Sequence, residues 1–341
     1  MDAFLTHTSD DRRRFCEEAS ITLGLQAAGV EKDFWVCWTL RELFALPDFG
    51  ARLTFKGGTS LSKCWKLIER FSEDIDVVMD RDFLGFGGGN APESAPSHKQ
   101  RAKRLEDLKS ACQNSIRQGL HPALQKRLQA KLPKGFDWTL TNDPDDVDQQ
   151  TLLFQYPTVF PSGGYLRPVV KIELGARSDT EPSELPEIRP FLVEALPAEF
   201  KSGAFKLRAV APERTFWEKA MLLHEETYRS GEVKPKARLA RHYYDLWCLI
   251  RSDIGDKAFS DKGLFSRVAA HRAVFFRKKK EAQESLKPGS LRLSPLEEQR
   301  GVWKQDYEAM REAMIFGDAP DFAEILRVVG DFERRFNATA Q

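Results

Sequence analysis

Apolar residues in the N-terminal part of the chain recur with helical spacing. The segment 11–46 carries apolar side chains at intervals near 3.6 residues, which predicts one helix that ends at the Pro-containing stretch 47–50. A second apolar series predicts a helix over residues 60–70. The side chains that define these two faces are Phe34, Trp35, Trp38, Leu40 and Leu43 in the first, and Leu61, Cys64, Trp65 and Ile68 in the second.

Short β-rich segments separate these helices and follow them. Residues 53–55 predict a strand that runs into the turn Gly57-Gly58, and residues 75–79 predict a second strand. Two longer strands are expected at 150–160 and 165–175, joined by a turn at 161–164. The front of the chain therefore combines strands with helices.

The remaining pattern is loop and helix. Residues 83–98 are rich in Gly, Pro and Ser and predict a mobile loop, and residues 99–132 predict a basic helical region. Helices are also expected at 213–227, 242–251 and 321–336. We therefore expect an α/β (α+β) fold with a small mixed sheet over residues 1–210, including a basic helical insertion at about 99–134, and a helical C-terminal domain over 211–341.

Composition excludes several classes of protein. The hydrophobic content is 41%, and no run of about 18 apolar residues suggests a membrane span. The polar N-terminus argues against a secretory signal, and five scattered cysteines without a CxxC pair argue against structural zinc. We expect a cytoplasmic protein with reduced thiols.

The net charge of +1 conceals an uneven distribution. Residues 99–134 hold ten Lys or Arg against two acids, and further basic runs occur at 234–241 and 277–280. Acidic residues gather at 143–148. Such segregation can give a neutral molecule a basic face that binds nucleic acid, although a charge run can also be only a solvated helix face.

Two aspartates on a predicted strand form the first candidate site. Asp74 and Asp76 are two residues apart, so both carboxylates project from the same face of the strand. Two such charges favour a cation between them, and Mg²⁺ is bound through one or two carboxylates together with substrate phosphates. The alternative is a pair of surface acids on an edge strand.

A glycine pair, separated from Asp74 by fifteen residues, forms the second candidate site. Lys56, Gly57, Gly58, Thr59 and Ser60 lie between a predicted strand and a predicted helix. Paired glycines let backbone amides approach an anion, and the following helix start offers N–H groups to phosphate. The segment is either such a phosphate cradle or a tight turn. Together with the aspartates it predicts a triphosphate site beside a metal site, as nucleotidyl transfer requires.

A charged pair on a later strand forms the third candidate site. Lys171 and Glu173 share one face of the otherwise apolar segment 169–174. Glu173 would be a third metal carboxylate, and Lys171 would neutralise charge on the triphosphate. The alternative is a Lys–Glu pair on a solvated strand face.

The segments 56–63 (KGGTSLSK) and 70–76 (RFSEDID) resemble the AbiEii toxin family, the nucleotidyltransferase toxins of type IV toxin–antitoxin systems, which include the MenT group. The helix before them (31–38) looks like that family's lead-in, and residues 213–223 and 241–246 look like its C-terminal motifs. The resemblance implies a polymerase-β-like nucleotidyltransferase core.

The resemblance also implies an activity. It implies Mg²⁺-dependent transfer of a nucleoside monophosphate from an NTP to RNA, with the 3′ end of tRNA as the acceptor, which blocks translation and arrests growth. Asp245 matches the acid of the last motif, whereas His242 replaces an aspartate that the family commonly has there. Asp245 would hold the base or sugar or orient Lys171, or else pair inside the core.

The family implies partners as well: an antitoxin encoded nearby that acts without a tight complex, and a role in phage defence. We expect a monomer. Two other functions stay open from the residues alone. One is nucleotidyl transfer to a protein or small molecule. The other is a non-catalytic partner-binding module, against which intact Asp74, Asp76, Lys171 and Glu173 argue.

Overall fold

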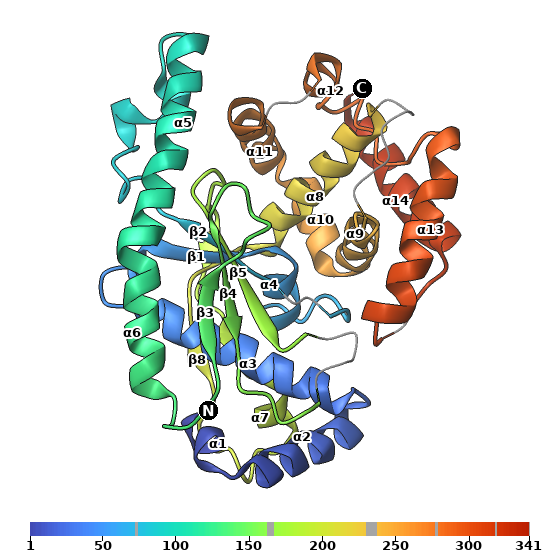
Figure 1. Cartoon of the computed structure of the whole chain (residues 1–341). Coiled ribbons are helices and arrows are strands. Elements are labelled where there is room, and N and C mark those ends of the chain that lie inside the picture. The colour runs from blue at the N-terminus through green and yellow to red at the C-terminus, as the bar shows by residue number, and fades with distance from the viewer. Residues whose placement is uncertain (72–73, 162–166, 230–236, 277–278, 318, 341) are drawn as a thin grey trace. The chain divides into compact units, whose positions relative to one another are not determined.

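The computed structural model describes residues 1–71, 74–161, 167–229, 237–276, 279–317 and 319–340 (Figure 1). The chain forms two compact units. The first comprises Met1–Cys64 and Glu73–Ala209, and the second comprises Trp65–Ser72 and Val210–Gln341. A short segment from the front of the chain thus belongs to the second unit, which nothing in the hydrophobic pattern indicates.

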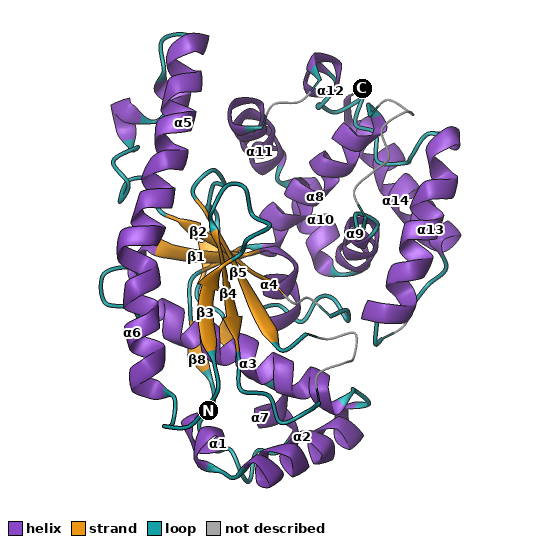
Figure 2. Ribbon diagram, viewed as in Figure 1, coloured by secondary structure: helices purple, strands orange, loops and turns teal. Residues whose placement is uncertain are grey.

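The first unit is built on a mixed seven-stranded sheet (Figure 2). Strand β2 pairs in parallel with β5 and antiparallel with β1, so the small mixed sheet expected from the sequence is present in larger form. In spatial order the strands are β3 (Thr139–Asn142), β4 (Thr151–Gln155), β5 (Val169–Gly175), β2 (Asp74–Met79), β1 (Leu53–Lys56), β9 (Ala209–Val210) and β6 (Ser183–Glu184). Strands β7 (Glu187–Ile188) and β8 (Phe205–Lys206) form a separate pair.

One face of this sheet is apolar and packs on helix α3 (Ala27–Phe44). Ile75 of β2 and Ile172 of β5 are fully buried on that face. The Trp38 ring of α3 stacks on Phe154 of β4 with ring centroids 6.1 Å apart. Because side chains alternate along a strand, the residues between these apolar positions project from the opposite face.

The prediction of a single helix over 11–46 is wrong in one respect, because this segment forms two helices. Helix α2 (Ser9–Leu23) ends at Gly24, whose φ of 66° is left-handed, and α3 begins at Ala27. Gly24 supplies the conformation that ends a helix, and the hydrophobic spacing does not register it. Helix α4 (Gly57–Lys63) likewise ends before the expected limit of 70, and Lys66 has a φ of 53°.

The remaining helices of the first unit include the predicted basic region. Helices α5 (His98–Ser115) and α6 (His121–Lys131) are joined by a π-helical turn over Ile116–Leu120, which confirms the helical character of this region. The Gly-rich segment before them contains two 3₁₀ turns, Gly88–Asn90 and Pro92–Ser94. Two short helices complete the unit: α1 (Asp2–Thr6) and α7 (Phe191–Ala195).

The strands expected at 150–160 and 165–175 are found as β4 and β5 and are shorter than expected. Their connecting turn was expected at 161–164, of which residues 162–164 lie outside the described residues. Strand β3 was not expected, because its sequence Thr-Leu-Thr-Asn carries one apolar residue and lacks a clear alternating pattern.

The second unit is helical, as the sequence predicts. Its core gathers aromatic rings, with Trp217 4.8 Å from Phe265 and 5.0 Å from Phe336 between centroids. Its helices are α8 (Pro212–Thr227), α9 (Arg241–Arg251), α10 (Asp253–Ser260), α11 (Lys262–Phe275), α12 (Lys280–Glu284), α13 (Glu297–Met314) and α14 (Phe322–Asn337). The predictions of helices at 213–227, 242–251 and 321–336 are confirmed.

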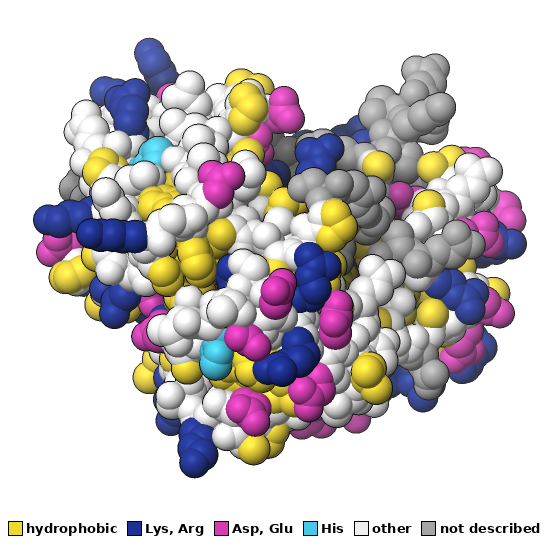
Figure 3. All heavy atoms as spheres, turned by 60° about the horizontal axis from the view of Figure 1, so that its bottom comes forward, with side chains coloured by type: hydrophobic (Ala, Val, Ile, Leu, Met, Phe, Trp, Pro, Cys, Tyr) yellow, Lys and Arg dark blue, Asp and Glu magenta, His cyan; other side chains and the backbone are white. Residues whose placement is uncertain are grey.

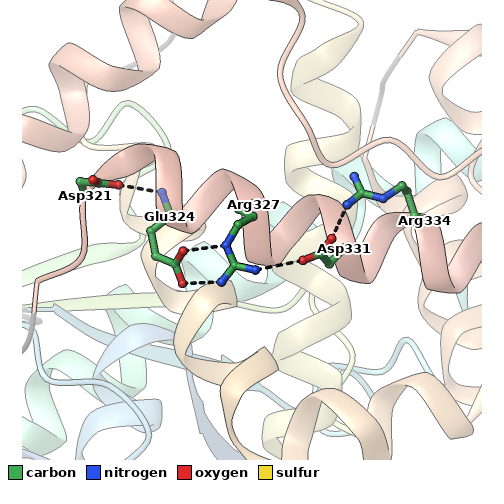
Figure 4. A network of polar contacts seen from close by, with 5 residues as sticks. All are labelled: Asp321, Glu324, Arg327, Asp331 and Arg334. Carbon is green, nitrogen blue, oxygen red and sulfur yellow. Dashed lines mark hydrogen bonds and ion pairs between the residues drawn. The ribbon is translucent and has the colours of Figure 1, made fainter.

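Charged side chains cover the outer face of α14 (Figure 4). Arg327 bonds Glu324 at 2.8 Å and Asp331 at 3.3 Å, and Asp331 also contacts Arg334. Asp321 caps the helix by accepting the Glu324 N–H at 2.7 Å. Exposed pairs of this kind contribute about 0–1 kcal/mol each, so this network marks a solvated face.

Among the helices of the described ranges, none has the length and apolar content needed to cross a bilayer.

Candidate active site

The polar face of the sheet brings the predicted strand residues together. In the parallel pairing of β2 with β5, Asp74 lies beside Lys171 and Asp76 lies beside Glu173. Lys56 at the end of β1 lies beside Asp76 on the other side. Residues in register on neighbouring strands project from the same face, and all five side chains are partly exposed, whereas Ile75 and Ile172 between them are buried.

Lys171 is held among carboxylates on this face. Its Nζ lies 2.8 Å from Oε1 of Glu173 and 3.7 Å from Oδ2 of Asp143. Partial burial acts to lower the pKa of Lys171. The hydrogen bond and charge of Glu173, with the charges of Asp74 and Asp143, outweigh that effect and raise it. Lys171 therefore carries a positive charge at neutral pH.

Asp143 is a member of this face that the sequence did not single out. It directly follows β3, and its N–H donates to the Thr151 carbonyl at 3.0 Å. Thr151 is in register with Glu173, so Asp143 extends the row of Lys56, Asp76 and Glu173 across the sheet. In the sequence it was visible only as one acid of the run 143–148, because strand register cannot be read from that run.

Gly57 packs directly against the Asp76 carboxylate. Its φ is +84°, a left-handed conformation that favours glycine, and a Cβ built on it would lie 2.1 Å from Oδ2 of Asp76. Thr59 adds a second tie, since its hydroxyl donates to the Asp74 carbonyl at 2.6 Å. The glycine turn thus lies beside the aspartates, whether or not it also binds phosphate.

The other residues of the predicted cradle have varied surroundings. Lys56 Nζ donates to Ser178 Oγ at 2.9 Å. Gly58 and Thr59 are buried, and Ser60 is fully buried with 0% exposure. A contact between the Ser60 hydroxyl and a nucleotide would require a local opening, so its role as a phosphate ligand stays a prediction.

A buried ion pair anchors helix α4 behind the turn. Lys63 Nζ lies 2.6 Å from Oδ1 of Asp33 on α3, and both side chains are at most 6% exposed. Asp33 also accepts the Phe191 N–H at 2.7 Å, and the Lys63 ammonium lies 3.6 Å from the centre of the Phe191 ring. Removing one partner would leave an uncompensated buried charge, so this pair holds α4 in place.

The donor set of the polar face suits a hard divalent cation. Asp74 and Asp76 present two carboxylates from one face. Mg²⁺ commonly binds one or two protein carboxylates together with substrate phosphates. The expected third ligand, Glu173, is bonded to Lys171. Within the described ranges, no group of three or more His, Cys, Asp or Glu side chains is arranged to hold a metal by itself. The site therefore fits a cation that arrives with a phosphate ligand.

Asp245 lies in the second unit, where it is fully buried and paired. Arg70 donates to both carboxylate oxygens, through Nε at 2.6 Å and Nη2 at 2.8 Å, and Lys219 Nζ lies 2.7 Å from Oδ2. Burial acts to raise the pKa of Asp245, but the charges of Arg70 and Lys219 hold it well below its usual range. The predicted contact of Asp245 with a base or sugar is not tested by this arrangement and stays a prediction.

His242 lies at the edge of this cluster. Its Nδ1 is 3.4 Å from Lys219 Nζ, and burial together with the charges of Lys219 and Arg241 lowers its pKa well below its usual value. His242 is therefore neutral at physiological pH. Arg70 and Lys219 were not singled out from the sequence, although both lie within the segments that carry the family resemblance.

The basic segments are only partly available to a ligand. Lys109 pairs with Asp148 at 2.5 Å and Arg127 with Glu42 at 2.7 Å, whereas six other basic residues of α5, α6 and their flanks are exposed. These six are Lys99, Lys103, Arg117, Lys126, Lys131 and Lys134. On the face seen in Figure 3, basic and acidic side chains lie next to each other and do not form a field of one sign. The other two runs lie partly outside the described residues, namely 234–236 and 277–278.

Nine chains among the solved structures are similar to this one, and they include the following three. MenT4, the nucleotidyltransferase toxin Rv2826c from Mycobacterium tuberculosis H37Rv, is 17% identical with a TM-score of 0.47, over 98% of this chain and 88% of that one. JHP933 from Helicobacter pylori is 14% identical with a TM-score of 0.35, over 91% and 93%. A putative nucleotidyltransferase from H. pylori is 13% identical with a TM-score of 0.37, over 91% and 96%.

No curated protein sequence matches the chain. The family comparison is decisive, because residues 38–328 match a single family over most of the chain's length. That range includes the glycine turn, both aspartates of β2 and the paired Asp245. The chain belongs to the family of the nucleotidyl transferase AbiEii toxin of type IV toxin–antitoxin systems.

Proposed function

We propose that this protein transfers a nucleoside monophosphate from an NTP to the 3′ end of an RNA, with tRNA as the acceptor, at the polar face of its sheet. The observation that carries the proposal is the register of β2 with β5, which gathers Asp74, Asp76, Lys171 and Glu173 on one face beside Gly57. Carboxylates and a lysine ammonium on one face suit phosphoryl transfer, in which negative charge moves between phosphate oxygens.

Each residue has a role in this proposal. Asp74 and Asp76 would hold Mg²⁺, with Glu173 as a further carboxylate nearby. When bound, the metal would lower the pKa of the acceptor hydroxyl and offset the charge on the leaving pyrophosphate. Lys171 would place its positive charge toward the triphosphate, and backbone N–H groups at Gly57 and Gly58 would bind the β and γ phosphates.

The RNA acceptor is proposed from the exposed basic residues of α5 and α6. RNA binding depends on Lys and Arg contacts with phosphate, and its affinity falls with salt in proportion to the number of contacts. The triple variant Lys99→Glu, Lys103→Glu and Arg117→Glu should weaken RNA binding and flatten the salt slope. Arg104 is a poor choice for this test, because it donates to the Ala91 carbonyl at 2.7 Å.

The deciding experiment incubates the protein with each labelled NTP, Mg²⁺ and total cellular RNA. Label in tRNA that depends on Asp76 would support the proposal. Label in protein or in a small molecule would replace the RNA acceptor with one of those classes, and no label from any NTP would refute catalysis.

Toxicity and regulation follow from the same proposal. Transfer to the 3′ end of tRNA would block aminoacylation, so induced expression should arrest bacterial growth, and Asp74→Ala should relieve the arrest. The family implies a cognate antitoxin, for which we propose action without a tight complex, with the toxin acting in the cytoplasm as a monomer. Harmless overexpression of an active enzyme would leave the transferase and remove the toxin.

A further inference from the structure

A cavity of about 250 Å³ lies in the first unit at the carboxyl ends of the parallel strands β2 and β5. Its walls come from the end of β2, from the Gly-rich segment that leads to α5 in Figure 1, and from residues 178–180 beyond β5. The Gly-rich wall is internally tied, since Ser94 Oγ donates to the Gly88 carbonyl at 3.0 Å and Arg81 pairs with Glu93 at 2.5 Å.

The cavity continues the polar face that carries the aspartates. Val78 lines it and follows Asp76 by two residues, so both project from the same face of β2, about 7 Å apart along the strand. Ser178 also lines it and accepts a hydrogen bond from Lys56, which is in register with Asp76. Gly57 lies at the opposite, amino end of β2. The path from Gly57 past Asp76 to the cavity therefore runs along β2, so a nucleotide with its phosphates at Gly57 could reach the cavity with its base.

The walls combine an apolar surface with an excess of acceptors. Val78 and Phe86 supply apolar and aromatic contacts, and Asp80, Asp82 and Asp179 line the same walls. Carboxylates repel phosphate but accept hydrogen bonds from amino groups, as they do from the exocyclic amine of cytosine. An aromatic side chain is a common partner for a base ring. The volume is below the range typical of drug-sized ligands, which suits one planar base.

We propose that this cavity binds a nucleobase that bears an exocyclic amino group, and that it thereby selects the nucleoside that reacts beside Asp74 and Asp76. The inference rests on the proposed nucleotidyl transfer at that face. The base has two possible sources with the same chemistry: the incoming NTP, or the 3′-terminal nucleoside of the acceptor.

Cytosine and uracil form the minimal pair for the test, because they differ by an amino group against a carbonyl at one ring position. Calorimetric titration would measure the Kd of CTP and UTP in one arm, and of the dinucleotides ApC and ApU in the other. We expect the cytosine ligand to bind at least about tenfold more tightly in one arm, and that arm identifies the source of the base.

Asp82→Asn is the decisive variant. The Asp82 carboxylate lies against Gly87, where an added Cβ would be 2.0 Å from Oδ1, and the amide keeps its shape while replacing an acceptor with a donor. The preference for cytosine over uracil should fall below about twofold. Asp48→Asn, an equal charge change at an exposed residue that does not line the cavity, should retain the preference.

The outcomes separate the two proposals. Equal binding of the cytosine and uracil ligands in both arms, or a preference that survives Asp82→Asn, would overturn the cavity assignment even if transfer is observed. Absence of transfer with every NTP would overturn the proposed function, while the binding measurements would still decide what the cavity takes.

Discussion

Gly57→Ala tests whether the glycine turn is needed to place the Asp76 carboxylate. The substitution has two separable costs. Alanine at a φ of +84° is strained by about 1–2 kcal/mol, and its Cβ would lie 2.1 Å from Oδ2 of Asp76. That separation is more than 1 Å below ordinary contact, so the carboxylate must move. A displacement of about 1 Å at a reacting centre costs roughly a hundredfold in rate, and we expect transfer to fall by that factor.

Gly24→Ala is the matched control. Gly24 has a φ of +66°, but a Cβ there would meet nothing within 4 Å. Urea unfolding of the two variants should therefore show a similar conformational cost for both and an additional destabilisation for Gly57→Ala alone. In the double variant Gly57→Ala/Asp76→Gly the added destabilisation should disappear, because the clashing carboxylate is gone.

The result that would refute the reasoning is specific. If Gly57→Ala transfers label at the wild-type rate, or if its unfolding free energy falls by no more than that of Gly24→Ala, the turn does not constrain Asp76. The assay is label transfer from the preferred NTP, measured together with urea unfolding of the same preparations.

Three further predictions follow from the same contacts. Asp76→Ala should abolish transfer in a folded protein, and Mg²⁺ with a non-hydrolysable NTP should raise the Tm of the wild type but not of this variant; transfer near the wild-type rate would exclude the metal role. Lys63→Met should lower the unfolding free energy, measured in urea, by about 3–5 kcal/mol, and adding Asp33→Asn should restore much of that loss. If the losses of the two single variants instead add up in the double variant, the buried ion pair is contradicted. Burial lowers the pKa of His224, so below a pH of about 6.5 the unfolded chain binds a proton that the folded protein does not. The unfolding free energy should therefore fall as the pH drops from 7.5 to 5, and it should fall less steeply in His224→Gln. Urea titrations at each pH would measure both slopes.

The charged residues on the polar face of the sheet were predictable from the sequence because their signals are local. Asp74 and Asp76 share a face by the two-residue period of a strand, and Lys171 and Glu173 do so by the same rule. Their mutual register was not predictable, since it depends on pairing between strands about a hundred residues apart. Asp143 shows most clearly what the sequence could not predict. It joins the polar face because it follows strand β3, and the sequence of β3 gives no clear strand pattern.

Helix boundaries failed where a single backbone conformation overrides the hydrophobic spacing. Gly24 divides the expected long helix, and Lys66, which adopts a positive φ despite its side chain, follows the early end of α4. Apolar periodicity continues through both positions, so it gave no sign of either break. Trp65 and Ile68, assigned to the face of that helix, instead lie in the segment that belongs to the second unit.

Asp245 shows why a matching motif does not by itself assign a catalytic role. An acid between aromatic and apolar residues of a helix has the same sequence signature whether it contacts a substrate or pairs inside the protein. Here both of its oxygens are bonded to Arg70 and Lys219, and the side chain is 0% exposed. Asp245→Ala would leave two buried cations without their common partner, which destabilises the second unit strongly. Loss of transfer in that variant would therefore not separate catalysis from folding. Asp245→Asn keeps the shape of the side chain but removes its charge, so the unfolding free energy should fall because Arg70 and Lys219 lose their counter-charge. Transfer measured per folded molecule, at a temperature where the variant stays folded, separates the two roles: a substrate-binding role predicts that transfer is lost, and a pairing role predicts that it is retained.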